Sequence, residues 1–208
     1  MNSNGALTRT YLRGGLSMLG LYAVLYGLTQ WLEAGHGYSP ETAGLLIVPM
    51  GALAAVVSRW VSGRNLIRWP LIACGASMLV ASLLTVLLDA RSPAVLIIAV
   101  TLVFGVTMGT TTVGNQTALY TEALPSQVGT ASGLFRTFCY VGSIASSTIT
   151  GIVFRTSVTD SGLHLIAWIL VGVSFLVLVM TVADRRLPPR ARLPAGRNDT
   201  RALRSYER

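Results

Sequence analysis

Charged residues divide the sequence into six long apolar stretches of 17 to 32 residues. Apart from Arg136 in the fifth, these stretches carry no charge and cover residues 14–32, 42–58, 69–88, 92–121, 123–154 and 161–183. A helix needs roughly 20 apolar residues to cross about 30 Å of hydrocarbon. The pattern therefore predicts an all-α membrane protein with six transmembrane helices joined by short loops.

The two ends of the chain are polar. We expect a short cytoplasmic segment over residues 1–11, a six-helix transmembrane bundle over residues 12–186, and a basic, disordered cytoplasmic tail over residues 187–208. The arginines of this tail either contact anionic headgroups or only set the topology. Residues 1–13 are polar and the apolar run after them is too long for a signal-peptide core, so we expect no cleavable signal.

The composition agrees with a lipid environment, since 52% of residues are hydrophobic and 12% are charged. The sequence pI near 10.3 would suit a nucleic-acid-binding protein, but the arginines cluster at the predicted membrane borders and in the tail. Cys74 and Cys139 both lie in apolar stretches without metal-ligand spacing. We therefore expect the lipid bilayer as the surrounding partner, no nucleic acid, no metal and no cofactor.

The arginines are distributed unevenly between the two sides of the predicted bundle. If the N-terminus is cytoplasmic, the cytoplasmic segments hold thirteen of the sixteen, and the external loops hold only Arg91 and Arg155. Positive charge stays on the cytoplasmic side of membrane proteins. This asymmetry predicts a multi-pass protein of the cell membrane (plasma or inner membrane) with both termini in the cytoplasm.

Two blocks of sequence carry motifs of a known transporter family. The first consists of Gln30-Trp31-Leu32-Glu33, Gly37-Tyr38-Ser39-Pro40-Glu41-Thr42-Ala43-Gly44-Leu45 and Pro49. The second consists of Gly114-Asn115-Gln116-Thr117-Ala118-Leu119, Pro125 and Gly129-Thr130-Ala131-Ser132-Gly133-Leu134-Phe135-Arg136-Thr137. In order and spacing these blocks resemble the C-terminal half of major facilitator transporters, and most closely the fourteen-helix drug:proton antiporters.

This resemblance implies one major facilitator bundle made of two three-helix inverted repeats. A short echo agrees with it, because Thr42-Ala43-Gly44-Leu45 opens the second helix and Thr130-Ala131-Ser132-Gly133 opens the fifth. The loop between the second and third helices is similar to the family's gating motif but lacks its acidic residue. Through this resemblance Arg64 and Arg68 become candidates for gating or interdomain contacts.

The resemblance also implies the function, which is proton-coupled efflux of small amphipathic or cationic drugs by alternating access. Such a mechanism needs two bundles, so a partner is implied, either an N-terminal half or a second copy. The alternative is a truncated or degenerate membrane module that transports nothing and needs or regulates a partner half. The predicted spans hold no central Asp or Glu, so any proton-coupling carboxylate must come from elsewhere.

Polar residues recur every four positions in the first helix. Tyr22, Tyr26 and Gln30 form one stripe, with Thr29 beside it. In the family this helix lines the translocation cavity, where aromatic and amide groups would suit drug-like substrates. The other interpretation puts the tyrosines in an aromatic belt or at a helix contact, although Tyr22 lies deep for a belt.

The fourth helix carries a second such stripe, and its counterpart also lines the family's cavity. Besides Phe104, the candidate residues are Thr101, Met108, Thr111, Thr112 and Asn115. We expect Tyr22, Tyr26 and Asn115 to face one water-accessible cavity. The spacing Gly105-x-x-x-Gly109 predicts a close approach by another helix.

Arg136 is the charged residue that the pattern places well inside a span. It either extends to the headgroups or makes a gating or interdomain contact, and the sequence does not separate these roles. A serine-protease site is excluded because Ser132 and His164 fall near opposite faces of the membrane, roughly 20–30 Å apart. We therefore expect no enzymatic activity.

Overall fold

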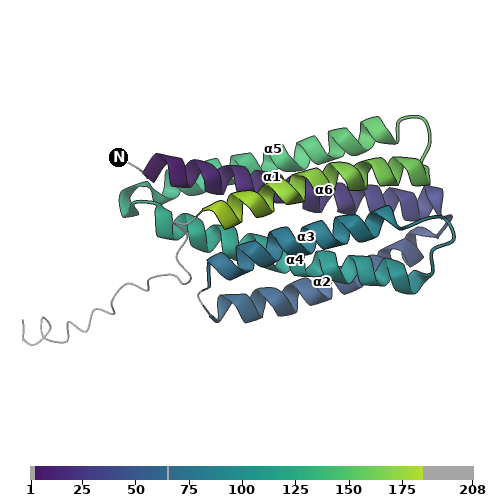
Figure 1. Cartoon of the computed structure of the whole chain (residues 1–208), viewed down its shortest axis with the longest axis horizontal. Helices are drawn as coiled ribbons and strands as arrows, with labels where there is room; N and C mark the ends of the chain where they lie inside the picture. Colours follow the sequence, from purple (N-terminus) through teal and green to yellow (C-terminus); the bar gives the residue numbers. More distant parts are fainter. Residues whose placement is uncertain (1–2, 65, 185–208) are drawn as a thin grey trace, which may run out of the picture.

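The computed structural model describes residues 3–64 and 66–184 and shows a bundle of long helices (Figure 1). The six α-helices are α1 (Ser3–Gln30), α2 (Pro40–Ser62), α3 (Arg68–Val86), α4 (Ala94–Glu122), α5 (Val128–Val153) and α6 (Asp160–Ala183). A π-helical turn, η1 (Trp31–Gly35), follows α1, and a 3₁₀ turn, η2 (Pro125–Gln127), precedes α5. The six predicted helices and the all-α class are confirmed for the described residues.

The structure describes the predicted N-terminal segment but not the predicted C-terminal tail. Helix α1 begins at Ser3, so the segment expected over residues 1–11 continues the first helix from that residue. The tail predicted over residues 187–208 lies outside the described residues.

The Gly37-Tyr38-Ser39-Pro40 motif fixes the start of α2. Gly37 has a φ of +79°, a left-handed conformation that glycine adopts without strain. The Ser39 hydroxyl accepts a hydrogen bond from the Thr42 amide and caps the helix, and Pro40 occupies its first turn. These residues end the connection from α1 and set the point where α2 begins.

The helices pack in an order that differs from their order in the chain. Helix α1 packs mainly against α5, α2 against α4, and α3 against α6 and α4. Apart from α3 and α4, helices that are consecutive in the chain, such as α2 and α3, make few contacts. At one end a large apolar core surrounds the fully buried Trp31, Phe104 and Met78.

Glycine sets the distance between α2 and α4. A Cβ added at Gly105 would lie 2.7 Å from the Met50 carbonyl oxygen, and one at Gly109 would lie 2.7 Å from that of Ala54. The backbones therefore meet at a separation that a larger side chain would prevent. This confirms that the Gly105-x-x-x-Gly109 spacing receives a neighbouring helix.

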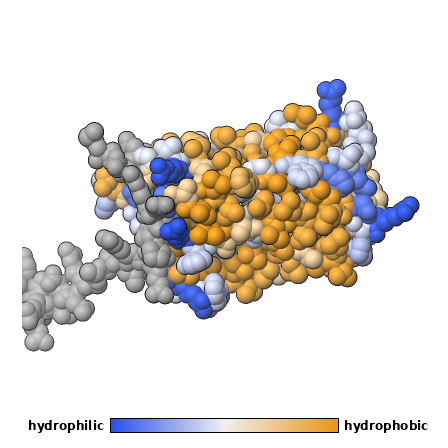
Figure 2. All heavy atoms as spheres, viewed as in Figure 1, coloured by the Kyte–Doolittle hydropathy of each residue, from blue (hydrophilic) through white to orange (hydrophobic). Residues whose placement is uncertain are grey.

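The outer surface matches a hydrocarbon environment. Figure 2 shows an apolar band across the visible face of the bundle, with hydrophilic side chains gathered at its two ends. Helices α2, α3, α4 and α6 are long and apolar enough to cross a membrane, whereas α1 and α5 fall outside that set and carry more polar residues. The chain is a multi-pass membrane protein.

Candidate functional site

Side chains of α1, α4 and α5 line a hollow of about 270 Å³ on one side of the bundle. The lining consists of Met18 and Tyr22 from α1, Thr112 and Gln116 from α4, and Phe135, Arg136, Cys139, Tyr140 and Ser143 from α5. The lining offers aromatic rings, hydrogen-bonding side chains and one cationic group. Such a surface can hold an amphipathic molecule by stacking and hydrogen bonding.

Tyr22, Tyr26 and Gln30 are spaced four residues apart on α1, so they share the helix face that borders the hollow at Tyr22. Tyr22 lines it, and the Tyr22 and Tyr26 rings lie 5.6 Å apart at a tilt of 38°. Tyr26 is 38% exposed, and Gln30 is exposed one turn further on. Thr29 is half-buried, and its hydroxyl donates to the Leu25 carbonyl within its own helix.

The candidates on α4 divide between two faces of the helix. Thr112 lines the hollow and Met108 is exposed one turn away, whereas Thr101, Thr111 and Asn115 are buried between helices. The Thr101 hydroxyl donates to the Leu46 carbonyl at 3.2 Å. The Thr111 hydroxyl lies 3.0 Å from the Cys74 sulfur.

The exposed face of α4 instead includes Gln116, which sequence reasoning missed. Met108, Thr112 and Gln116 are spaced four residues apart and are all exposed. This i, i+4 spacing was the available signal.

The three candidate arginines lie at two separate positions in the bundle. Arg136 is exposed and lines the hollow, where no carboxylate pairs with it among the described residues. Arg64 lies over the Trp60 ring at 3.9 Å from the ring centroid, and Arg68 begins α3. These two therefore belong to the α2–α3 turn and stand apart from the hollow.

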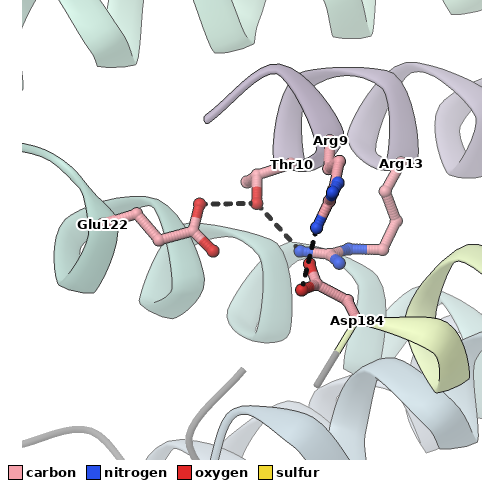
Figure 3. A network of polar contacts seen from close by, with 5 residues as sticks. All are labelled: Arg9, Thr10, Arg13, Glu122 and Asp184. Carbon is pink, nitrogen blue, oxygen red and sulfur yellow. Dashed lines mark hydrogen bonds and ion pairs between the residues drawn. The ribbon is translucent and has the colours of Figure 1, made fainter. Parts of the chain in front are cut away.

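A buried polar network lies at the end of the bundle where α1 begins (Figure 3). Arg13 is 1% exposed; its Nε donates to Asn115 Oδ1 at 3.0 Å and its Nη2 donates to Thr10 Oγ1 at 2.9 Å. Thr10 in turn donates to Glu122 Oε2 at 2.9 Å, and Arg9 pairs with Asp184 at 3.3 Å. The network joins α1 to α4 and α6.

Sequence reasoning placed Arg13 at a membrane border and did not expect it to be buried. The available signal was the spacing of Thr10, Arg13 and Ser17, which puts three polar residues on one face of α1. Asn115 is thereby engaged by Arg13, and in this structure it lies behind the hollow instead of on its surface.

The two faces of α4 can be distinguished by chemical labelling. In a chain with Cys74→Ser and Cys139→Ser, Thr112→Cys should react readily with a membrane-impermeant thiol reagent, because Thr112 is exposed in the hollow. Thr111→Cys, one residue away and buried, should react at least about tenfold more slowly. Equal labelling of the two positions would show that the hollow is not the solvent-accessible side of α4.

Comparison with known proteins places the chain in a family. The sequence profile described as Major Facilitator Superfamily matches residues 3–147. The chain is 27% identical over 184 residues to the uncharacterized MFS-type transporter YwoD of Bacillus subtilis (strain 168), covering 85% of this chain and 40% of that protein. It is 30% identical over 136 residues to the multidrug resistance protein Stp of Mycobacterium tuberculosis, covering 63% of this chain and 25% of that one.

Solved structures agree on the fold. A crystal structure of a peptide transporter, POT, in complex with sulfate superposes with a TM-score of 0.64 at 14% identity, covering 99% of this chain and 44% of that one. The chain thus spans less than half the length of these relatives. Because the family profile covers well over half of its sequence, the chain belongs to the Major Facilitator Superfamily.

Proposed function

We propose that this chain is the C-terminal half of a proton-coupled multidrug exporter that works by alternating access. The observation that carries the proposal is the open hollow between α1, α4 and α5, with its aromatic and polar lining. In transporters of this kind the substrate site lies near the midplane, at the interface of two bundles. The likeness to the multidrug resistance protein Stp supports drug-like substrates, amphipathic or cationic in character.

The packing order supports two three-helix units, α1–α3 and α4–α6, related by a two-fold axis. A two-fold axis would place α1 on α4 and α2 on α5. The contact between α1 and α5 would then correspond to the contact between α4 and α2, and both contacts are extensive. Inverted repeats of this type underlie alternating access. We further propose that α1 and α5 also cross the membrane and turn their polar faces toward a second bundle, with both termini in the cytoplasm of the cell-membrane protein.

The proton carrier is proposed to lie outside the hollow. None of the described residues that line it is acidic. A partner half, or a second copy of this chain, would complete the cavity. The same lack of a carboxylate favours the second candidate function, a membrane module that does not transport by itself.

Transport assays separate these functions. The chain alone, reconstituted in liposomes with an imposed pH gradient, should move no fluorescent cationic dye. A chimera that joins it to the preceding helices of YwoD should move the dye in a gradient-dependent manner, and Tyr22→Ala in that chimera should reduce the rate about tenfold or more. A folded chimera without transport would support the module, whereas gradient-dependent transport by the chain alone would contradict the need for a partner.

A further inference from the structure

A groove runs between α2 and α3 at the end of the bundle near the turn that joins them. These helices barely touch, and α4 forms the floor of the space between them, which measures about 430 Å³. The groove is lined by Val57, Trp60, Val61, Leu66, Trp69, Pro70, Ala73, Val106 and Thr110. The Thr110 hydroxyl donates to the Val106 carbonyl at 2.7 Å, so the floor presents no free donor. This hollow therefore suits a hydrocarbon chain.

The mouth of the groove combines aromatic rings with positive charge. Trp60 on α2 is 55% exposed and Trp69 on α3 is 64% exposed, and tryptophans are typical of the headgroup level of a membrane. The Arg64 guanidinium lies 3.9 Å from the centroid of the Trp60 ring. Because a ring face holds a cation in place, Arg64 is kept beside the groove.

Among the described residues, no acidic side chain pairs with this charge. Arg59 on α2 and Arg68 at the start of α3 stand near Arg64 in the sequence, and residues 42–88 contain no Asp or Glu. Within the described part of the chain, none of these three arginines forms an ion pair. The described residues therefore make the mouth a cationic site and supply no counterion to it.

We propose that this groove binds an anionic phospholipid, with one acyl chain between α2 and α3 and the phosphate against Arg64 and Arg68. The groove opens on the lipid-facing side of α2 and α3, where Val56, Val80 and Leu83 are exposed to the surroundings. Basic pockets between transmembrane helices recognise anionic headgroups, and each arginine adds attraction. This site is separate from the hollow lined by α1, α4 and α5, and it does not depend on the proposed transport function.

Tryptophan fluorescence can measure the preference directly. The full chain with Trp168→Phe, reconstituted in phosphatidylcholine, retains Trp60 and Trp69 at the groove and Trp31 buried elsewhere. Brominated lipids quench tryptophans that they contact. Brominated phosphatidylglycerol should bind at the quenching site about fivefold or more tightly than brominated phosphatidylcholine.

Two variants test the two parts of the site. Arg64→Gln with Arg68→Gln should reduce the ratio of phosphatidylglycerol affinity to phosphatidylcholine affinity to about one. Arg91→Gln with Arg155→Gln, far from the groove, should leave this ratio unchanged. Ala73→Phe fills the groove without changing charge and should also remove the preference. Equal quenching by the two lipids overturns the proposal. It is also overturned if the preference survives both Arg64→Gln/Arg68→Gln and Ala73→Phe, because the attraction would then be a general surface effect.

Discussion

Arg13→Met is expected to lower the free energy of unfolding by about 3–5 kcal/mol. The substitution removes the donors that Arg13 supplies to Asn115 and Thr10, and it leaves the buried Asn115 oxygen without its partner. It also removes the positive charge beside Glu122, whose carboxylate accepts from Thr10. Because the Arg13–Asn115 hydrogen bond joins α1 to α4, the loss weakens the contact between these two helices.

The measurement can use Cys74, which is buried among α1, α3 and α4. In a Cys139→Ser background, a thiol-reactive dye should label Cys74 only as the protein unfolds, so the labelling midpoint reports stability. Arg9→Met is the matched control on the same helix. Arg9 is exposed and makes one ion pair, with the buried Asp184, so its loss removes a single charge-assisted contact and should cost less than the loss of Arg13.

Arg13→Lys separates charge from geometry. Lysine keeps the positive charge near Glu122 but cannot present the planar guanidinium that reaches both Asn115 and Thr10. We expect an intermediate loss. If Arg13→Met and Arg9→Met shift the labelling midpoint equally, the hydrogen bonds of Arg13 contribute no more to stability than the single Arg9–Asp184 ion pair.

The helices could be predicted because their signals are local. Six apolar stretches of 17 to 32 residues, bounded by charges, each contain most of one helix. The Gly105-x-x-x-Gly109 spacing predicted a close helix contact, since only small residues allow backbones to meet. The pairing partners were not predictable in the same way. That α2 meets α4 depends on the packing of the whole bundle, which no local pattern encodes.

The stripe predicted on α4 includes residues from both the exposed face and the buried face of the helix. The sequence stripe included Thr111, Thr112 and Asn115, but the exposed face follows Thr112 and Gln116. Successive residues on a helix differ by about 100° in direction, so an error of one position moves a side chain from the hollow to the interior. The polarity of a residue does not indicate which face it occupies, because a polar side chain can also be buried where it finds a hydrogen-bond partner. Asn115 is buried and accepts a hydrogen bond from Arg13.

The arginines show the same limit of sequence reasoning. Arg13 stands at the edge of an apolar stretch and Arg136 inside one, yet Arg13 is buried and Arg136 is exposed. The difference arises because Asn115 on α4 and Thr10 on α1 accept hydrogen bonds from Arg13, whereas Arg136 faces the hollow. Burial of a charge is thus decided by neighbours distant in sequence.

Gly142→Ala is expected to separate α1 from α5 and to destabilise the bundle by about 3 kcal/mol. A Cβ at Gly142 would lie 2.1 Å from the Gly15 carbonyl oxygen, well below a contact distance of roughly 3.5 Å. The same contact is tight from the other side, where a Cβ at Gly15 would lie 2.9 Å from the Phe138 carbonyl oxygen. Backbone atoms make both clashes, so a side-chain rotation cannot relieve them.

Gly133→Ala provides a control of opposite sign on the same helix. No atom lies within 4 Å of a Cβ at Gly133, so alanine should only improve helix propensity, by up to about 1 kcal/mol. The unfolding midpoints of the two variants, measured by Cys74 labelling, should therefore move in opposite directions. Ser143, next to Gly142, and Cys139, one turn before it, both line the hollow. Gly142→Ala should therefore also slow dye transport in the YwoD chimera, whereas Gly133→Ala should leave it unchanged. Equal midpoints for the two variants would mean that α1 and α5 are not in backbone contact at Gly142.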